Sequence, residues 1–174
     1  MAEEKIEVMY SEEEVNARIR ELGAQISADL KGEPVKLVCV LKGASFFACE
    51  LAKRLTVPVY MDFMYVSSYG NGTESSGNVR ITKDLDAPIE GENVLIVEDI
   101  IDSGHTLHYL SQEFQNRGAA KVMICTLLSK PDRREVDVPV DYVGYVIPDR
   151  FVVGYGLDYA QRYRNLPFVG AVEF

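Results

Sequence analysis

The chain has 174 residues, of which 47% are hydrophobic and 26% are charged, a balance typical of one compact domain rather than of a disordered or fibrous protein. Its 18 Lys and Arg residues are outnumbered by 27 Asp and Glu residues, which gives a formal net charge of −9. This charge repels polyanions, so the composition argues against nucleic acid and against a membrane surface as partners. The charge does not exclude a small phosphorylated ligand, because a few hydrogen-bond donors and cations at a binding site outweigh the repulsion from distant carboxylates.

The cysteines and the first residues predict the compartment. Cys39, Cys49 and Cys125 show no Cys-x-x-Cys spacing and lie in apolar runs, which predicts reduced core thiols in a reducing compartment. The chain begins without a basic segment followed by an apolar one, and no stretch has the length of a membrane span. We therefore expect a cytoplasmic protein.

The first part of the chain carries one helix, one strand and a second helix. Ser11 and Glu14 form a capping box, and the apolar residues that follow recur at helical spacing, which predicts a helix over 12–31. The nearly continuous apolar run over 35–41 is typical of a strand buried on both faces, and a helix over 44–55 follows it. These elements begin a β-α-β unit.

The alternation continues to about residue 147. A helix over 106–117 ends at Gly118. The remaining predicted strands cover residues 57–66, 93–98, 121–128 and 142–147. This order predicts an α/β fold with a mostly parallel central sheet flanked by helices, in a single domain over 1–174.

Two segments interrupt the alternation. Residues 67–78 contain three glycines and four serines, and cannot bury much surface, so they are predicted to form a mobile excursion. An inert surface loop and an active-site lid are both compatible with that composition. Residues 149–174 are rich in aromatic side chains, which suit either the core or a contact between subunits.

The turn before the third predicted helix is a candidate phosphate site. The first N–H groups of a helix have no intrahelical partner and carry partial positive charge, so they can cradle a phosphate. The competing interpretation is that Asp102 or Ser103 only caps the helix and that Gly104 only turns the chain. The candidate cradle consists of Ser103, Gly104, His105, Thr106 and Leu107.

Three carboxylates crowd the end of the strand that leads into this turn, where ligands of open α/β sheets bind. Capping accounts for one of Glu98, Asp99 and Asp102, but not for all three. Their mutual repulsion predicts a compensating cation, Mg²⁺ because the donors are hard oxygens, or a polyhydroxylated ligand. Neither the Gly-x-Gly-x-x-Gly nor the Gly-x-x-x-x-Gly-Lys-Ser/Thr pattern occurs, which argues against a dinucleotide site and against a P-loop NTPase.

Residues 94–107 resemble the phosphoribosyl-pyrophosphate (PRPP) signature of the type I phosphoribosyltransferase family, in the form found in its hypoxanthine-guanine branch. The resemblance extends over nearly the whole chain. The further matching motifs are Leu41-Lys42-Gly43, Ser68-Tyr69, Leu128-Ser129-Lys130, the run from Pro148 to Tyr155, and Leu157-Asp158-Tyr159. Several motifs in the family order are far more specific than the signature alone.

The resemblance implies roles for the signature residues. The turn over 103–107 would hold the 5-phosphate of PRPP, with the backbone amide of His105 mattering more than its side chain. Glu98 and Asp99 would contact the ribose hydroxyls and the metal, provided that the backbone bends, since adjacent strand residues point to opposite faces. The alternative is a structural Glu98 that points away. Asp102 matches the general acid or base near purine N7, and helix capping is its competing role.

The resemblance also implies which residues bind the leaving pyrophosphate. Lys42 and Gly43 match the pyrophosphate loop, in which family members often have a non-proline cis peptide bond. Asp158 matches a residue that holds Mg²⁺ on the pyrophosphate, and Arg164 one that contacts the pyrophosphate itself. Without the resemblance, each of these charges would be read as a solvated surface group.

The resemblance also implies residues that bind the purine and residues that form a lid. Lys130 matches the lysine that donates to the 6-oxo group, because an ammonium favours a carbonyl over an amino group. Phe151 would stack on the base, its alternative being core packing, and Val152 would offer backbone groups to the purine edge. Ser68 and Tyr69 match a closing loop, which would keep water from a reactive ribosyl cation.

The implied function is a purine-salvage transferase that uses Mg²⁺. It would transfer 5-phosphoribosyl from PRPP to N9 of hypoxanthine, and of guanine, to give IMP or GMP and pyrophosphate. The implied architecture adds a small hood built from the chain termini, a mobile loop at about 67–80, and a homodimer or homotetramer. The alternatives are a xanthine-preferring transferase and a PRPP-sensing regulatory binding protein of the same fold.

Overall fold

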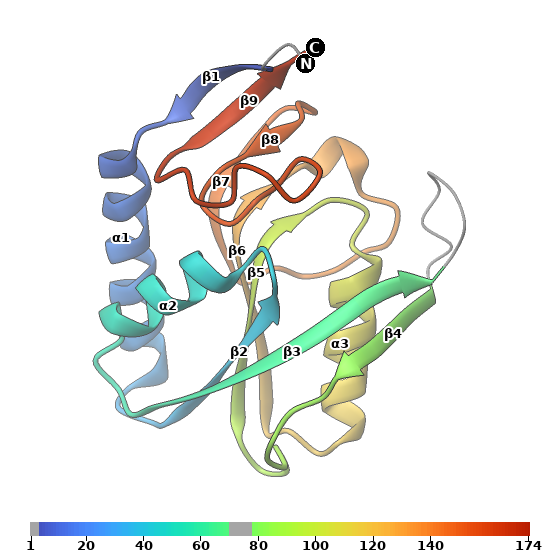
Figure 1. Cartoon of the computed structure of the whole chain (residues 1–174). Coiled ribbons are helices and arrows are strands. Elements are labelled where there is room, and N and C mark those ends of the chain that lie inside the picture. The colour runs from blue at the N-terminus through green and yellow to red at the C-terminus, as the bar shows by residue number, and fades with distance from the viewer. Residues whose placement is uncertain (1–3, 70–77) are drawn as a thin grey trace.

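The computed structural model describes residues 4–69 and 78–174, with the side chains of Ser68 and Tyr69 left out. Its centre is a six-stranded sheet with the strand order β4-β3-β2-β5-β6-β7 (Figure 1). These strands are β2 (Val35–Leu41), β3 (Val59–Tyr69), β4 (Asn78–Lys83), β5 (Asn93–Ile101), β6 (Lys121–Ser129) and β7 (Tyr142–Val146). All neighbouring strands from β3 to β7 pair in parallel, and β4 pairs antiparallel with β3. The predicted mostly parallel sheet is confirmed.

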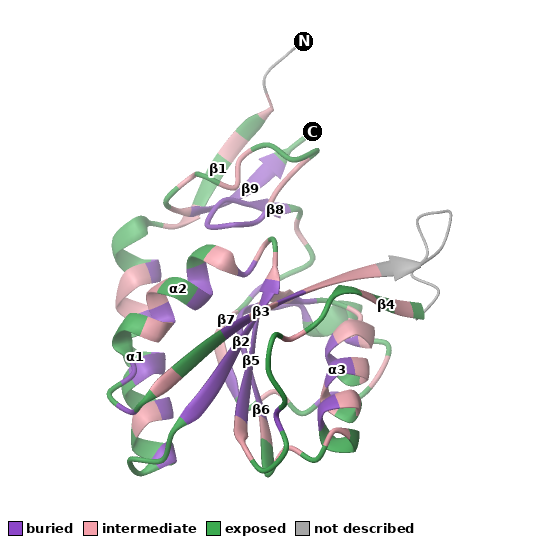
Figure 2. Ribbon diagram, turned by 60° about the horizontal axis from the view of Figure 1, so that its bottom comes forward, coloured by how far each residue is buried: buried purple, intermediate pink, exposed green. Residues whose placement is uncertain are grey.

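Helices cover both faces of this sheet. Two of them, α1 (Glu12–Leu30) and α2 (Ser45–Arg54), pack on one face, and α3 (His105–Asn116) packs on the other (Figure 1). A short 3₁₀ turn, η1 (Pro131–Arg133), follows β6. Buried residues concentrate on the strands and on the sheet-facing sides of the helices, so the sheet lies between two apolar layers (Figure 2). No helix in the described part of the chain has the length and apolar character needed to cross a membrane.

Helix α1 begins and packs as its local sequence predicts. The Ser11 hydroxyl accepts a hydrogen bond from the Glu14 N–H at 3.2 Å, and the Glu14 carboxylate accepts one from the Ser11 N–H at 2.9 Å, so the predicted capping box is present. The side chains at three- and four-residue spacing are buried as predicted: Val15, Ile19, Leu22, Ile26 and Leu30.

A second, three-stranded sheet joins the two ends of the chain. Its strands are β1 (Lys5–Tyr10), β9 (Val169–Glu173) and β8 (Val152–Val153), in the order β1-β9-β8 and all antiparallel. It lies at the end of the central sheet where β2 and β5 finish (Figure 1). This sheet therefore stands over the edge that carries the predicted site.

Two boundaries differ from those predicted. Strand β5 continues to Ile101, three residues beyond the predicted end, so Asp99 lies within the strand rather than after it. Strand β3 extends to Tyr69, and its antiparallel partner β4 begins at Asn78, so both ends of the predicted loop are extended. The prediction of mobility falls on residues 70–77, outside the described residues.

Candidate active site

The two acids of β5 form an interacting pair. The Asp99 N–H donates to Oε1 of Glu98 at 3.2 Å, and the Ile100 N–H donates to Oδ1 of Asp99 at 2.7 Å. Burial raises the pKa of both groups, and the Asp99 carboxylate raises the pKa of Glu98 further. The repulsion between these neighbouring acids favours a cation or hydroxyl donors beside them.

The backbone around this pair of acids is closely packed. The peptide bond between Leu41 and Lys42 is cis. At Gly43, a Cβ atom would overlap the carboxylate of Asp99, and a Cβ atom at Gly156 would overlap the carbonyl oxygen of Gly43. The end of β2, the acids of β5 and the loop after β8 thus meet at a point where only glycine fits.

The predicted phosphate turn lies at the start of α3. Its N-cap is Gly104, whose φ of 90° lies in the left-handed region, and no side chain caps the helix. The alternative that Asp102 or Ser103 caps α3 is therefore wrong. A cavity of about 120 Å³ opens beside the turn. Its lining includes Glu98, Asp102, Ser103, Gly104, Thr106 and Leu107.

The N–H groups of His105, Thr106 and Leu107 are the first of the helix, where no intrahelical carbonyl is available to them. The imidazole of His105 does not add to this cradle, because its Nε2 lies 2.7 Å from Oε2 of Glu135. The turn can therefore hold an anion through backbone donors alone.

Lys130 places an ammonium between two carboxylates. Its side chain is 10% exposed, and its Nζ lies 3.9 Å from Oδ1 of Asp102 and 3.8 Å from Oδ1 of Asp149. Arg133 also pairs with Asp149, at 2.8 Å. The Asp102 side chain is 51% exposed, so its carboxylate remains open to a ligand beside the ammonium.

The loop after β8 gathers the residues that the resemblance assigns to the pyrophosphate. Arg164 pairs with Asp158 at 3.1 Å and donates to the carbonyl of Gly156 at 2.6 Å. Its charge also lowers the pKa of Asp99 against the larger effect of burial. Gln161 accepts hydrogen bonds from both Lys42, at 3.5 Å, and Arg164, at 3.2 Å. Sequence reasoning missed Gln161, because an exposed amide in a loop carries no local signal.

Phe151 lies on the surface rather than in the core. Its ring is 44% exposed and contacts the rings of Tyr159 and Phe174 edge-on, at centroid distances of 5.5 and 5.8 Å. Core packing is thus not its role. Val152 is buried in β8, paired with Ala171. Ser68 and Tyr69, which are predicted to belong to a lid, end β3, but their side chains and residues 70–77 lie outside the described residues.

The described residues contain no group of three or more His, Cys, Asp and Glu side chains placed to hold a metal ion. The acids instead supply a coupled pair, Glu98 and Asp99, and a separate Asp158 paired with Arg164. Mg²⁺ is usually held by one or two carboxylates together with substrate phosphates. This donor set therefore fits a Mg²⁺ ion that arrives with a phosphorylated substrate, rather than a permanent metal centre.

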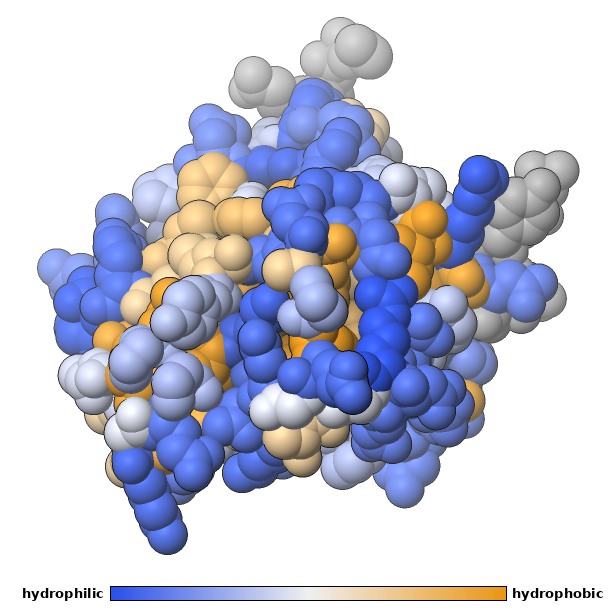
Figure 3. Space-filling view, turned by 90° about the horizontal axis from the view of Figure 1, so that it is seen from below, coloured by the Kyte–Doolittle hydropathy of each residue, from blue (hydrophilic) through white to orange (hydrophobic). Residues whose placement is uncertain are grey.

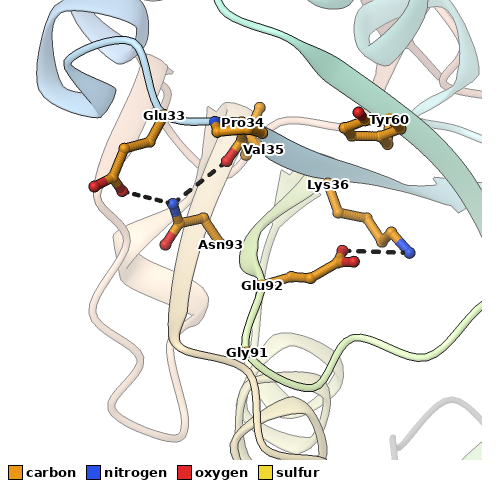
Figure 4. Close-up of a pocket in the computed structure, with 8 residues that line it drawn as sticks. All are labelled: Glu33, Pro34, Val35, Lys36, Tyr60, Gly91, Glu92 and Asn93. Atoms are coloured by element: carbon orange, nitrogen blue, oxygen red, sulfur yellow. Dashed lines mark hydrogen bonds and ion pairs between the residues drawn. The ribbon is translucent and has the colours of Figure 1, made fainter.

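A larger cavity, of about 380 Å³, lies at the opposite end of the sheet, beside the starts of β2, β3 and β5 (Figure 4). Its lysine, Lys36, already pairs with Glu92 at 3.4 Å and donates to the carbonyl of Pro88. Figure 3 shows this face, where hydrophilic side chains surround small apolar areas. Ligands of parallel sheets bind at the carboxyl ends of the strands, so the acidic edge is the candidate site.

Known proteins resemble the chain over nearly its whole length. The model of the phosphoribosyl transferase domain matches residues 9–160. A hypoxanthine phosphoribosyltransferase of Salmonella typhimurium is 54% identical over 169 residues, which cover 96% of this chain and 95% of that protein. The structure of a hypoxanthine-guanine phosphoribosyltransferase of Bacillus anthracis matches with a TM-score of 0.94 and 47% identity, over 98% of this chain and 100% of that one.

Some relatives are much longer. The bifunctional protein TilS/HprT of Listeria innocua is 55% identical over 166 residues, which cover 95% of this chain. The match covers 26% of that protein, so the chain spans about a quarter of the length of this relative.

Proposed function

This chain belongs to the family of phosphoribosyl transferase domains, and from that premise we propose that it is a purine-salvage enzyme. It transfers the 5-phosphoribosyl group of PRPP to N9 of hypoxanthine and guanine, giving IMP or GMP and pyrophosphate. The names of relatives that match over nearly their whole length support this substrate class. One observation carries the proposal: the buried ammonium of Lys130 lies beside the exposed carboxylate of Asp102. Asp102 itself follows β5 and directly precedes the turn at the start of α3.

The turn at the start of α3 binds the 5-phosphate through the amides of residues 103–107. The Glu98–Asp99 pair contacts the ribose hydroxyls. As the bond between the anomeric carbon and the pyrophosphate oxygen breaks, the ribosyl ring gains positive charge, as in glycoside chemistry. The negative charge of the partly buried Glu98–Asp99 pair stabilises that cation-like ring.

The purine is held by its 6-oxo group and by its face. Lys130 donates to the 6-oxo oxygen, Phe151 stacks on the ring, and Val152 presents backbone groups to the purine edge. As N9 bonds to the anomeric carbon, the purine must lose a proton. Asp102 accepts that proton at N7, so the product leaves as a neutral base on the ribose.

The leaving pyrophosphate is bound by the backbone of Lys42 and Gly43 and by the guanidinium of Arg164. Asp158 would hold a Mg²⁺ ion that arrives with PRPP, and the ion would supply positive charge that offsets the charge on the leaving group. Ser68 and Tyr69 contribute to a lid that keeps water from the ribosyl cation.

The close fit at Gly43 gives a specific prediction. Gly43→Ala is expected to raise the KM for PRPP about tenfold, because the new Cβ overlaps the Asp99 carboxylate and displaces the pyrophosphate loop. Steady-state kinetics with PRPP varied at saturating hypoxanthine measures this. Gly23→Ala is the matched control, since its Cβ would press on Arg54 between α1 and α2. The control is expected to lower the melting temperature with an unchanged KM for PRPP, and a similar rise in both variants would contradict the assignment.

A substrate panel tests the function itself. Purified protein with PRPP and Mg²⁺ is expected to form nucleotide from hypoxanthine and guanine, and not from adenine. Activity is expected to fall at least tenfold when EDTA removes Mg²⁺, and to return with added MgCl₂. Faster use of xanthine than of hypoxanthine would establish the xanthine-preferring alternative. Formation of no nucleotide from any base, together with PRPP binding, would establish a PRPP sensor.

We further propose that the enzyme works in the cytoplasm as a homodimer or homotetramer. Cys39 and Cys125 are buried as predicted, whereas Cys49 is exposed on α2 and the prediction of a core position for it is wrong. All three thiols are free, which suits a reducing compartment. Apolar side chains on α2 and on β3 are exposed, with Phe46 48% and Tyr60 61% accessible, and such surfaces suit a contact between copies. Light scattering of the purified protein measures the number of subunits.

A further inference from the structure

The end of β6 and the segment after it are hydrogen-bonded through their backbone to the turn before α3. We call residues 129–136 the strap. The Lys130 N–H donates to the carbonyl of Ile101 at 3.0 Å, and the N–H groups of Glu135 and Val136 donate to the carbonyl of Ser103 at 2.9 and 3.2 Å. These bonds bracket Asp102 but leave its own carbonyl to another donor.

That donor is the side chain of Arg134. Its Nε donates to the backbone carbonyl of Asp102 at 3.0 Å, and its Nη2 donates to the hydroxyl of Ser129 at 3.0 Å. Its Cδ lies against Gly104, where an added Cβ would come within 3.0 Å of it. One guanidinium thus joins the peptide of Asp102 to the residue that precedes Lys130.

The backbone on either side of Asp102 is held by these bonds, but the other restraints on its side chain are weak. Its side chain is half exposed and its nearest charged neighbour, Lys130, is 3.9 Å away. The helix that follows has no side-chain cap to stiffen the turn. A guanidinium presents its donors in a fixed plane, so it holds two acceptors at a set separation, which a single ammonium cannot do.

We propose that Arg134 is a positioning residue for purine transfer: its guanidinium sets the place of the Asp102 carboxylate relative to the Lys130 ammonium. The proposal rests on the function proposed above, because it assigns Arg134 to the proton transfer at N7 through Asp102. Arg134 itself contacts neither PRPP nor the base. Its loss therefore misplaces the proton acceptor while the phosphate turn keeps its backbone amides.

The test compares Arg134→Met and Arg134→Lys with the native chain. Both variants are expected to lower kcat with hypoxanthine about tenfold and to leave the KM for PRPP within about twofold. Lysine keeps the positive charge but lacks the planar pair of donors that bonds both Asp102 and Ser129, so it is expected to fail as methionine does. Arg117→Met is the matched control, since Arg117 pairs with Asp84 and Glu113 at the far end of α3. The control is expected to lower the melting temperature and to leave kcat unchanged. Full activity of Arg134→Lys, or equal losses in kcat and in PRPP affinity, would overturn the proposal.

A double-mutant cycle with Ser129→Ala tests the connection to the strap and serves if Arg134→Met folds poorly. Ser129→Ala removes one of the two acceptors and is expected to lower kcat about threefold. Combined with Arg134→Lys, it is expected to add no further loss, because both changes break the same link. Independent, multiplicative losses would overturn the proposal. A native chain that makes no nucleotide refutes the proposed function, whereas an active native chain with equally active variants refutes only the role of Arg134.

Discussion

Asp102→Asn is expected to lower kcat for hypoxanthine by 10²- to 10⁴-fold, on the order of what a positioned proton acceptor contributes. The amide keeps the size of the carboxylate and an acceptor oxygen but takes up no proton at neutral pH. The KM for PRPP is expected to stay within about threefold, because the amides of the phosphate turn are unchanged. Steady-state kinetics with each substrate varied in turn measures both quantities.

The structure sharpens the interpretation of that result. Because α3 has Gly104 as its N-cap and no side-chain cap, Asp102→Asn removes no capping bond, and the melting temperature is expected to change by only a few degrees. Asp141→Asn is a suitable control, since that carboxylate accepts from the Ile124 N–H near the start of β6, away from the site. A kcat loss shared by both variants, or equal losses in kcat and PRPP affinity for Asp102→Asn, would contradict the assignment of Asp102.

Lys130→Met is expected to lower kcat/KM for hypoxanthine and for guanine about 10- to 100-fold, because a hydrogen bond from a charged donor contributes about 1.5–3 kcal/mol. The variant removes the donor to the 6-oxo group and also leaves Asp102 and Asp149 without the ammonium between them. Both carboxylates are partly exposed and can be hydrated, so the protein is expected to remain folded. The KM for PRPP is expected to be nearly unchanged.

Lys36→Met is the matched control for this change. Lys36 is as buried as Lys130, but it pairs with Glu92 at the other end of the sheet (Figure 4). We expect Lys36→Met to lower the free energy of unfolding without altering the choice of base. An unchanged kcat/KM for both 6-oxopurines in Lys130→Met would remove Lys130 from the purine site.

The regular elements that position the site were readable from local pattern. The capping box at Ser11 and the buried helical stripe behind it predicted α1 to within one residue, and the apolar run over 35–41 predicted β2 at both ends. The reason is that helix capping and the periodic burial of side chains depend on residues a few positions apart. The acids before Gly104 likewise predicted a ligand site at the carboxyl edge of β5, because carboxylates are unusual at the end of an apolar strand.

Four short strands could not be predicted from a periodic pattern of apolar residues. The strands of the small sheet, β1, β8 and β9, and the edge strand β4 were not predicted, since two to six residues of mixed polarity carry little periodicity. Their strand geometry depends on partners far along the chain: Lys5 lies opposite Glu173, and Val152 opposite Ala171. Only the folded chain brings these partners together.

The sequence by itself determined the parallel sheet, its three helices and the acidic edge that leads into the turn before α3, because each depends on residues close together along the chain. The tertiary structure decided which groups meet there. It showed that Gly104, and not Asp102, caps α3, that Gly43 fits between Asp99 and Gly156, and that Arg134 links Asp102 to the strap. These contacts join residues up to more than a hundred positions apart, and their free energy arises only once strand pairing has closed the loops between them, so no local pattern records them.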